Sequence, residues 1–190
     1  MDIRHEERMI QKLDAPWRKD VLPPDKTLLR LSLLPGQTAA DIGCGTGYLA
    51  LPACRITGTG KVYAMDISTR MLAETARRAE AEKLGNLITL QTDGKTFPIE
   101  ENCIDFTFTC NVLHEAEDKE GFIAEMKRIT KPGGSICVIE WTKRKMPFGP
   151  DEASRLNMGE TAALFREAGL AASEYFLLGA LHYAIKAKKR

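Results

Sequence analysis

The sequence has no apolar run long enough to cross a lipid bilayer, and it lacks the features of an exported protein. A transmembrane helix needs roughly 18 or more consecutive apolar residues. The chain begins with the polar stretch Met1-Asp2-Ile3-Arg4-His5, which does not resemble a signal peptide. We therefore expect a protein that is neither inserted in a membrane nor exported by that route.

The cysteine content does not indicate disulfide bonds or a metal site. The five cysteines include no C-x-x-C pair, and their number is odd: Cys44, Cys54, Cys103, Cys110 and Cys137. This pattern argues against a disulfide framework and against a zinc site. Three of them lie in apolar, strand-like runs, where a free thiol packs as a small hydrophobe. We expect a reduced, cytoplasmic setting and no metal site.

The chain also has no large excess of positive or negative charge. The formal net charge is +1, so long-range electrostatics nominate no polyanionic partner. A basic face interleaved with aromatic residues, as nucleic-acid binding requires, is absent, and the basic residues 186–190 suit a solvated chain end. With 190 residues and 44% hydrophobic content, the chain suits a single domain with a sizeable core.

Five short apolar runs are spaced along the chain from Thr38 onward. They cover residues 38–42, 61–65, 87–92, 104–110 and 135–141. Each has the length of a strand and is mostly apolar on both faces, as buried parallel strands are. Residues 173–188 read as two strands around the tight turn Gly179-Ala180-Leu181-His182, with no room for a crossover helix.

Helical patterns fit between these runs. Ser68 and Asp118 are good N-caps for helices over residues 68–84 and 118–129, and a third helix covers residues 159–168. Gly85 and Gly169 are expected to end the first and third helices. We predict five β-α units in a Rossmann-like, doubly wound α/β fold. Its seven-stranded, mostly parallel sheet ends in an antiparallel hairpin.

The segment before the first strand is treated separately. Residues 1–37 are expected to form a helical cap or lid, and residues 38–190 the domain proper, within a single domain overall. Arg8, Trp17 and Arg18 are the residues that we expect in such a lid, from their position alone.

The densest chemical signal is the stretch D-x-G-x-G-x-G at residues 41–47, between the first strand and a helix. Glycines permit positive φ and let a ligand lie against the backbone. The dinucleotide fingerprint G-x-G-x-x-G needs a third glycine where Tyr48 stands. Asp41 would also repel a pyrophosphate, whereas a carboxylate suits the sulfonium and ammonium of S-adenosylmethionine. Asp66 ends the second run about 20 residues on, where this architecture binds ribose hydroxyls.

These features, in order, resemble a known family. Residues 41–47, 64–66, 92–94, 97–105, 111–115 and 129–134 look like successive motifs of class I S-adenosylmethionine-dependent methyltransferases. The pattern is most similar to the small-molecule branch that includes the ubiquinone and menaquinone C-methyltransferases. The resemblance is strong over residues 36 to 142 and loose elsewhere.

The resemblance implies S-adenosylmethionine as cofactor and a set of residues that bind it. They are Asp41, Gly43, Cys44, Gly45, Gly47, Asp66, Ile67, Met71, Asp93, Gly94 and Asn111. In the family's scheme Asp41 and the glycine loop hold the methionine end, and Asp66 holds the ribose. Ile67 packs on the adenine, Asp93 accepts from its amino group, and Asn111 lies beside the sulfonium.

Methyl transfer needs alignment more than acid–base help, so a base is optional. His114 is our candidate base, since it follows the fourth strand at the ligand edge, and Glu115 adjoins it. Glu140 and Trp141, at the end of the fifth run, are candidates to line the acceptor pocket, with core packing an equal alternative for Trp141. His5 and His182 are expected to be incidental.

The acceptor is narrowed mainly by what is missing. An N-P-P-Y-type turn, typical of amine and amide methylases, is absent after the fourth strand, and there is no Pro-Cys loop of a cytosine C5 enzyme. We expect a small-molecule acceptor. Three alternatives stay open: a catalytically silent S-adenosylmethionine-binding module, an NAD-dependent oxidoreductase, and a partner-binding scaffold.

Overall fold

The computed structural model describes residues 3–190, with side chains described for Glu7 and from residue 9 onward. Over these residues seven strands form one sheet in the order β3-β2-β1-β4-β5-β7-β6. The strands are β1 (Ala39–Ile42), β2 (Val62–Asp66), β3 (Leu87–Gln91), β4 (Ile104–Cys110), β5 (Thr130–Trp141), β6 (Ala172–Leu178) and β7 (His182–Lys188). The first five pair in parallel, while β7 pairs antiparallel to both β5 and β6. The predicted fold class is confirmed.

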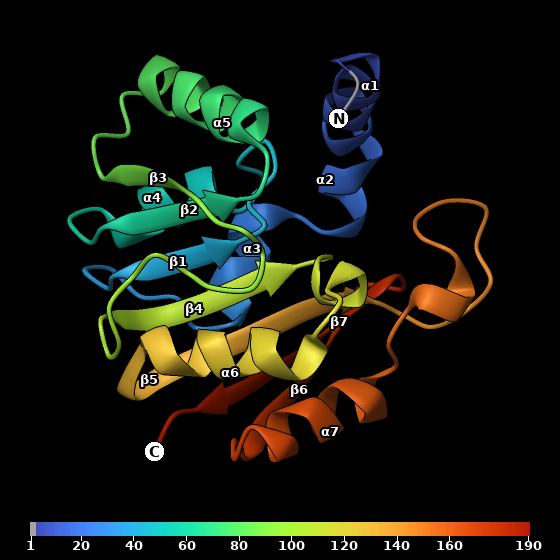
Figure 1. The fold of residues 1–190 in the computed structure, drawn as a ribbon. Coiled ribbons are helices and arrows are strands. Elements are labelled where there is room, and N and C mark those ends of the chain that lie inside the picture. Colours follow the sequence, from blue (N-terminus) through green and yellow to red (C-terminus); the bar gives the residue numbers. More distant parts are fainter. Residues whose placement is uncertain (1–2) are drawn as a thin grey trace.

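Helices cover both faces of this sheet (Figure 1). The helices α3 (Pro24–Arg30), α4 (Ala50–Thr57) and α5 (Thr69–Ala81) share one apolar core, which includes Leu28, Ala53 and Leu72. The helices α6 (Lys119–Ile129) and α7 (Met158–Glu167) share the other core, through residues such as Ile123 and Phe165. Burial on both faces explains why the central strands read as continuous apolar runs.

The predicted helix starts hold, but one helix end does not. Ser68 accepts the Met71 N–H at 3.3 Å and Asp118 accepts the Gly121 N–H at 2.8 Å, so both are N-caps. Helix α5 ends at Ala81, not at Leu84, because Lys83 takes the left-handed conformation with φ of 57°. Gly85 was expected to end this helix, but Lys83 takes the left-handed conformation two residues earlier. The Leu84 N–H then donates to Ala79 O, which closes the last turn.

Strand β5 is longer than predicted. It begins at Thr130, directly after α6, and includes the Lys131-Pro132-Gly133-Gly134 segment that was expected only to separate helix from strand. The segment pairs with a residue near the end of the chain. Gly133 N–H donates to Lys189 O at 2.7 Å, and Lys189 N–H donates to Gly134 O at 3.0 Å. The far end of the chain therefore completes the start of β5.

No helix joins β3 to β4, which corrects the expectation of five β-α units. Residues 92–103, all of them described, form a loop. Asp93 accepts the Lys95 and Thr96 N–H groups at 2.8 and 2.7 Å, an Asx turn that competes with helix formation. Asn102 then takes a positive φ of 58°.

The first helices lie beyond the carboxyl ends of the parallel strands. Helices α1 (Ile3–Leu13) and α2 (Trp17–Val21) stand at that edge, next to the loop that follows β5 (Figure 1). Asp14, just after α1, pairs with Arg78 of α5 at 2.6 Å. The 1–37 segment contains α1, α2 and α3 joined by turns, and its role as a lid stays a prediction. The Arg8 side chain lies outside the described residues. In the part of the chain that the structure describes, none of the helices has the length and apolarity of a membrane span.

Candidate active site

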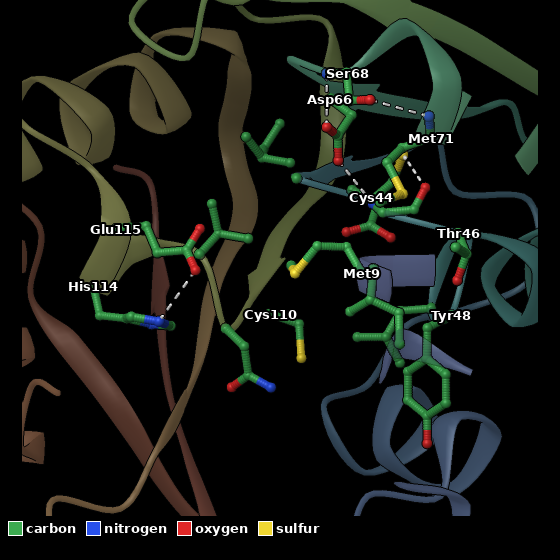
Figure 2. Close-up of a pocket in the computed structure, with 18 of the residues that line it drawn as sticks. Met9, Cys44, Thr46, Tyr48, Asp66, Ser68, Met71, Cys110, His114 and Glu115 are labelled. Atoms are coloured by element: carbon green, nitrogen blue, oxygen red, sulfur yellow. Dashed lines mark hydrogen bonds and ion pairs between the residues drawn. The ribbon is translucent and has the colours of Figure 1, made fainter. Parts of the chain in front are cut away.

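One cavity of about 810 Å³ opens at the carboxyl edge of the sheet, where the strand order reverses between β1 and β4. Its cofactor side consists of the ends of β1, β2 and β3 with the glycine loop. Its acceptor side consists of the ends of β4 and β5 with residues 148–150. The segment that holds α1 and α2 borders both sides. Figure 2 shows His114 and Glu115 on one side of the cavity and Asp66 on the other. Ligands in doubly wound folds bind at this switch point.

Most predicted site residues do meet in this cavity. Those that line it are Asp41, Gly43, Cys44, Gly45, Asp66, Ile67, Met71, Gly94, Asn111, His114 and Glu115. Gly47 and Asp93 do not line it. Gly47 has a φ of +83°, and a Cβ there would lie 3.0 Å from Thr75, so its glycine serves the packing of α5 against the loop.

The glycine loop is shaped by backbone contacts. Gly43 has a φ of +74°, and a Cβ on it would overlap the Val112 side chain. The N–H groups of Gly43 and Cys44 both donate to Met65 O, at 2.8 and 2.9 Å. Thr75 donates its hydroxyl to Gly45 O at 2.8 Å. These backbone contacts fix the shape of the loop, and its glycines leave backbone accessible to a ligand.

Asp66 joins the second strand to this loop. One carboxylate oxygen accepts the Gly45 N–H at 2.9 Å, and the other accepts the Ser68 N–H at 2.9 Å. Two backbone donors hold the carboxylate in place at the cavity wall, and its predicted ribose contact stays a prediction.

Asp41 is the buried acid of the cavity, with 2% of its surface exposed. Burial raises the pKa of its carboxyl to about 8, and the nearby charge of Asp66 adds to the effect. A carboxyl with this pKa gains its charge when a cationic group arrives beside it. The site thus responds to positive charge in a ligand.

An exposed apolar side chain follows β2 at the cavity. Ile67 is 60% exposed and lines the cavity, and a Cβ on Gly94 would lie 3.4 Å from it. Asp93 does not line the cavity, and its carboxylate serves its own Asx turn. Hydrogen bonds from Thr96 and Lys95 lower its pKa. Its predicted adenine contact stays a prediction.

His114 and Glu140 form a buried pair on the acceptor side. His114 Nδ1 lies 2.9 Å from a Glu140 carboxylate oxygen, and the His114 backbone N–H donates to the same group at 3.1 Å. Glu140 is fully buried beneath the histidine, so it does not line the acceptor pocket, contrary to expectation. Burial lowers the pKa of His114, but the hydrogen bond and charge of Glu140 outweigh it, and the net shift is upward.

Glu115 stands at the outer nitrogen of the same histidine. Its carboxylate lies 3.6 Å from His114 Nε2, and its side chain is 71% exposed. His114 therefore lies between a buried inner carboxylate and an exposed outer one, with its Nε2 on the side of Glu115 and the cavity (Figure 2).

His182 was expected to be incidental, but it supports the cavity wall. It is 1% exposed, stacks on Trp141 with ring centroids 4.2 Å apart, and lies 3.2 Å from the Asn111 amide nitrogen. Burial, followed by the charges of Arg18 and Arg155, lowers its pKa to about 3, so it is neutral. Asn111 holds a φ of +60°, and its amide oxygen has no partner among the described residues.

Aromatic side chains from three segments close the acceptor side. Trp17 of α2 lies 5.1 Å from Phe148 and 6.4 Å from Trp141, centroid to centroid. Arg155, itself 1% exposed, donates to the carbonyls of Arg144, Phe148 and Pro150 at 2.6 to 3.0 Å. The loop after β5 is thus held over Trp141, and the predicted lid residues Trp17 and Arg18 do border the cavity.

This arrangement agrees with the comparison to known families. A family model described as a methyltransferase domain matches residues 40–138, more than half of the chain. The chain belongs to this methyltransferase family. The predicted resemblance to class I S-adenosylmethionine-dependent methyltransferases is thereby confirmed, and membership implies S-adenosylmethionine as the cofactor.

Individual relatives agree with this family. A crystal structure of a SAM dependent methyltransferase from Aquifex aeolicus matches with a TM-score of 0.90 and 28% identity, over 95% of this chain and 96% of that one. A demethylmenaquinone methyltransferase of Oceanobacillus iheyensis is 33% identical over 65% of this chain and 50% of its own length. A ubiquinone/menaquinone biosynthesis C-methyltransferase of Francisella tularensis subsp. novicida is 31% identical over 70% and 51%. The chain spans about half the length of these curated relatives.

Several cavity residues of this methyltransferase were not foreseen. Met9 and Leu13 of α1, Tyr48, and Phe148 all line the site. Only Tyr48 carried a local signal, since it directly follows the glycine loop. The others come from segments whose sequence shows nothing that distinguishes them from ordinary surface or core residues.

Proposed function

We propose that the protein transfers the methyl group of S-adenosylmethionine to a small-molecule acceptor. The observation that carries the proposal is a single cavity with the glycine loop and Asp66 at one side and His114 at the other. At about 810 Å³ the cavity falls within the range of small-molecule sites. Cofactor and acceptor would therefore meet in one enclosed space.

The described residues fit this cofactor. The glycines of the loop admit a ligand against the backbone, and Asp66 lines the cavity, where it would accept from the ribose hydroxyls. Asp41 adds a buried carboxyl that favours positive charge. NAD is disfavoured because Tyr48 stands where the dinucleotide fingerprint needs its third glycine.

When bound, S-adenosylmethionine supplies a methyl group on a sulfonium, an activated carbon that an acceptor attacks in line. The residues of the chain contribute alignment and exclusion of water. Asp66 and the glycine loop fix one partner, and Trp17, Trp141 and Phe148 enclose the other. Alignment of this kind is worth roughly 7–11 kcal/mol of the barrier.

His114 is the base in this proposal. The Glu140 carboxylate accepts the backbone N–H groups of Trp141 and His114. It also lies 2.9 Å from His114 Nδ1, so it acts as the acceptor there and Nδ1 is the donor. That assigns the proton to Nδ1 and leaves the Nε2 lone pair toward the cavity. A histidine oriented by a buried carboxylate can remove a proton from an acceptor hydroxyl or acidic carbon.

The acceptor class follows from the aromatic wall and the base. A planar molecule with a proton that His114 can remove meets both conditions. The relatives named above are demethylmenaquinone and ubiquinone/menaquinone methyltransferases, so a demethylated quinol is the first acceptor to try.

The test has two stages. Titration calorimetry with S-adenosylmethionine, S-adenosylhomocysteine and NAD is expected to show micromolar binding of the two adenosyl ligands and none of NAD. Transfer of labelled methyl to a panel of quinols, phenols and thiols then measures turnover, with His114→Asn as the base variant. Absence of adenosyl binding refutes the proposal; binding without turnover on any acceptor would identify a catalytically silent binding module instead.

A further inference from the structure

The positive charges of the cavity come from one place. Among the described residues that line it, the lysine and arginine side chains are Lys12 and Arg18, both on the segment before the first strand. The cofactor side contributes two carboxyls, Asp41 and Asp66. Among the described lining residues Arg18 alone carries a guanidinium, and it belongs to the N-terminal segment, not to the glycine loop.

Arg18 is held beside the glycine loop. Its guanidinium lies 4.1 Å from the ring centroid of Tyr48, the residue that directly follows Gly47. The Tyr48 hydroxyl donates to Leu22 O at 2.7 Å, which fixes the ring under the guanidinium. Arg18 donates one N–H to Leu13 O and forms no ion pair with a described carboxylate. Its remaining donors are free for a ligand.

The preceding residues dock on the same loop. Leu13 Cδ1 lies 3.1 Å from the position that a Cβ on Gly45 would occupy. Asp14 accepts the Thr46 hydroxyl at 3.2 Å and pairs with Arg78 at 2.6 Å. The stretch from residue 12 to residue 18 therefore lies over the part of the loop assigned to the methionine end of the cofactor.

The methionine end of the cofactor carries a carboxylate as well as an ammonium group. Asp66 contributes a carboxylate to this wall, and a second carboxylate on the ligand is repelled there unless a cation stands beside it. We propose that Arg18 binds the carboxylate of the cofactor's methionine moiety, so that the N-terminal segment is part of the cofactor site. The planar guanidinium offers two parallel N–H donors for such a group. This inference rests on the proposed use of S-adenosylmethionine.

The test is a cycle that changes the ligand and the protein separately. S-adenosylhomocysteine and its decarboxylated analogue, S-adenosyl-3-thiopropylamine, differ only in the carboxylate, and calorimetry gives both affinities. Wild-type protein should prefer S-adenosylhomocysteine by roughly 10- to 100-fold, the strength of a charge-assisted hydrogen bond. In Arg18→Met this preference should disappear, while affinity for the analogue stays within about 2-fold.

Matched variants make the result specific. Lys19→Met removes the same charge from the next residue of α2, whose side chain is exposed and outside the cavity, and should keep the full preference. Arg18→Lys should restore part of it. Thermal unfolding checks that each variant folds, and Arg18→Gln is the second variant if Arg18→Met does not.

The outcomes separate cleanly. Loss of the preference in Arg18→Met alone supports the inference. An Arg18→Met protein that still prefers S-adenosylhomocysteine as wild type does overturns it, as does an equal weakening of both ligands. If wild-type protein binds neither ligand, the proposed function fails, and this inference fails with it; if wild type binds both ligands equally, only this inference fails.

Discussion

The two sides of the cavity are built in different ways. The cofactor side is largely backbone: the Gly43 and Cys44 N–H groups donate to Met65 O, and Asp66 is held by two further backbone donors. The acceptor side is made of side chains from distant segments, such as Trp17, Trp141 and Phe148. A ligand shared by many relatives can be bound by backbone groups, whose positions do not depend on the side chains. A variable ligand requires side chains that can be exchanged.

The largest effect should come from filling the glycine loop. Gly43→Ala places a Cβ on Val112 at a φ of +74°, so we expect at least 100-fold weaker S-adenosylhomocysteine binding. The positive φ alone costs about 1–2 kcal/mol of unfolding free energy. Calorimetry and urea unfolding measure the two effects.

Gly36→Ala is the control for that change. Gly36 has a φ of +79° with nothing within 4 Å of an added Cβ, and it lies outside the cavity. It should lose similar backbone energy and keep ligand binding. Wild-type affinity in Gly43→Ala would show that the loop does not contact the ligand.

A second prediction compares two aspartates at neighbouring strand ends. Asp66→Ala removes the acceptor of two backbone N–H groups on the cavity wall, and we expect roughly 10- to 100-fold weaker S-adenosylhomocysteine binding. Asp93→Ala should weaken binding less, because the Asp93 carboxylate already serves its own turn. Calorimetry on both variants measures the difference. Equal losses would instead support the adenine contact that the family resemblance implies for Asp93.

The third prediction concerns pH on the acceptor side. In the folded protein His114 should titrate above its ordinary value of 6.5, and Glu140→Gln should lower its pKa. Since the folded pKa is raised, protonated His114 stabilises the fold fully below about pH 6.5, and this contribution is lost as pH rises through the folded value. Histidine NMR titration measures the pKa without any acceptor.

His182 gives the internal comparison for that titration. Its pKa of about 3 means that it should stay neutral across the range in which His114 titrates. This depressed pKa has the opposite sign: its stabilising contribution is present above about pH 6.5 and is lost as pH falls toward 3. If the His114 pKa is unchanged in Glu140→Gln, Glu140 does not act on His114 as proposed.

The smallest effect should come from the aromatic mouth. Phe148→Leu removes one ring from contact with Trp17, and Phe148 is 40% exposed. We expect a change in unfolding free energy below about 1 kcal/mol and S-adenosylhomocysteine affinity within 2-fold. Trp17 and Trp141 are the two tryptophans of the chain, so their fluorescence reports the change directly. Strongly weakened cofactor binding would mean that the two sides are not separable.

The same contrast explains what could be predicted from sequence. Gly43 and Asp66 were foreseen because strand ends and glycine spacing follow local rules of backbone geometry. His182 was not, since it lies 71 positions from Asn111 in the sequence and their contact depends on β7 returning beside β5. Phe148 shows no periodic pattern at all.

Errors at the element boundaries have the same origin. Lys83 ended α5 in a conformation that glycine usually takes, and the Gly133 region joined β5 only because Lys189 paired with it. The loop from residue 92 to residue 103 replaced an expected helix through hydrogen bonds of Asp93. In each case the sequence pattern is compatible with two positions for the boundary of a helix or strand. Hydrogen bonds that the pattern does not reveal favour one of them.

Arg155 has a consequence for how such a protein can change. Its guanidinium holds the loop after β5 through main-chain carbonyls, at Arg144, Phe148 and Pro150. Every residue type carries a carbonyl, so side chains in that loop can be replaced without loss of the anchor. The loop is therefore a natural position for sequence diversification, in evolution or in a directed library, with Arg155 kept constant and the residues around Phe148 varied.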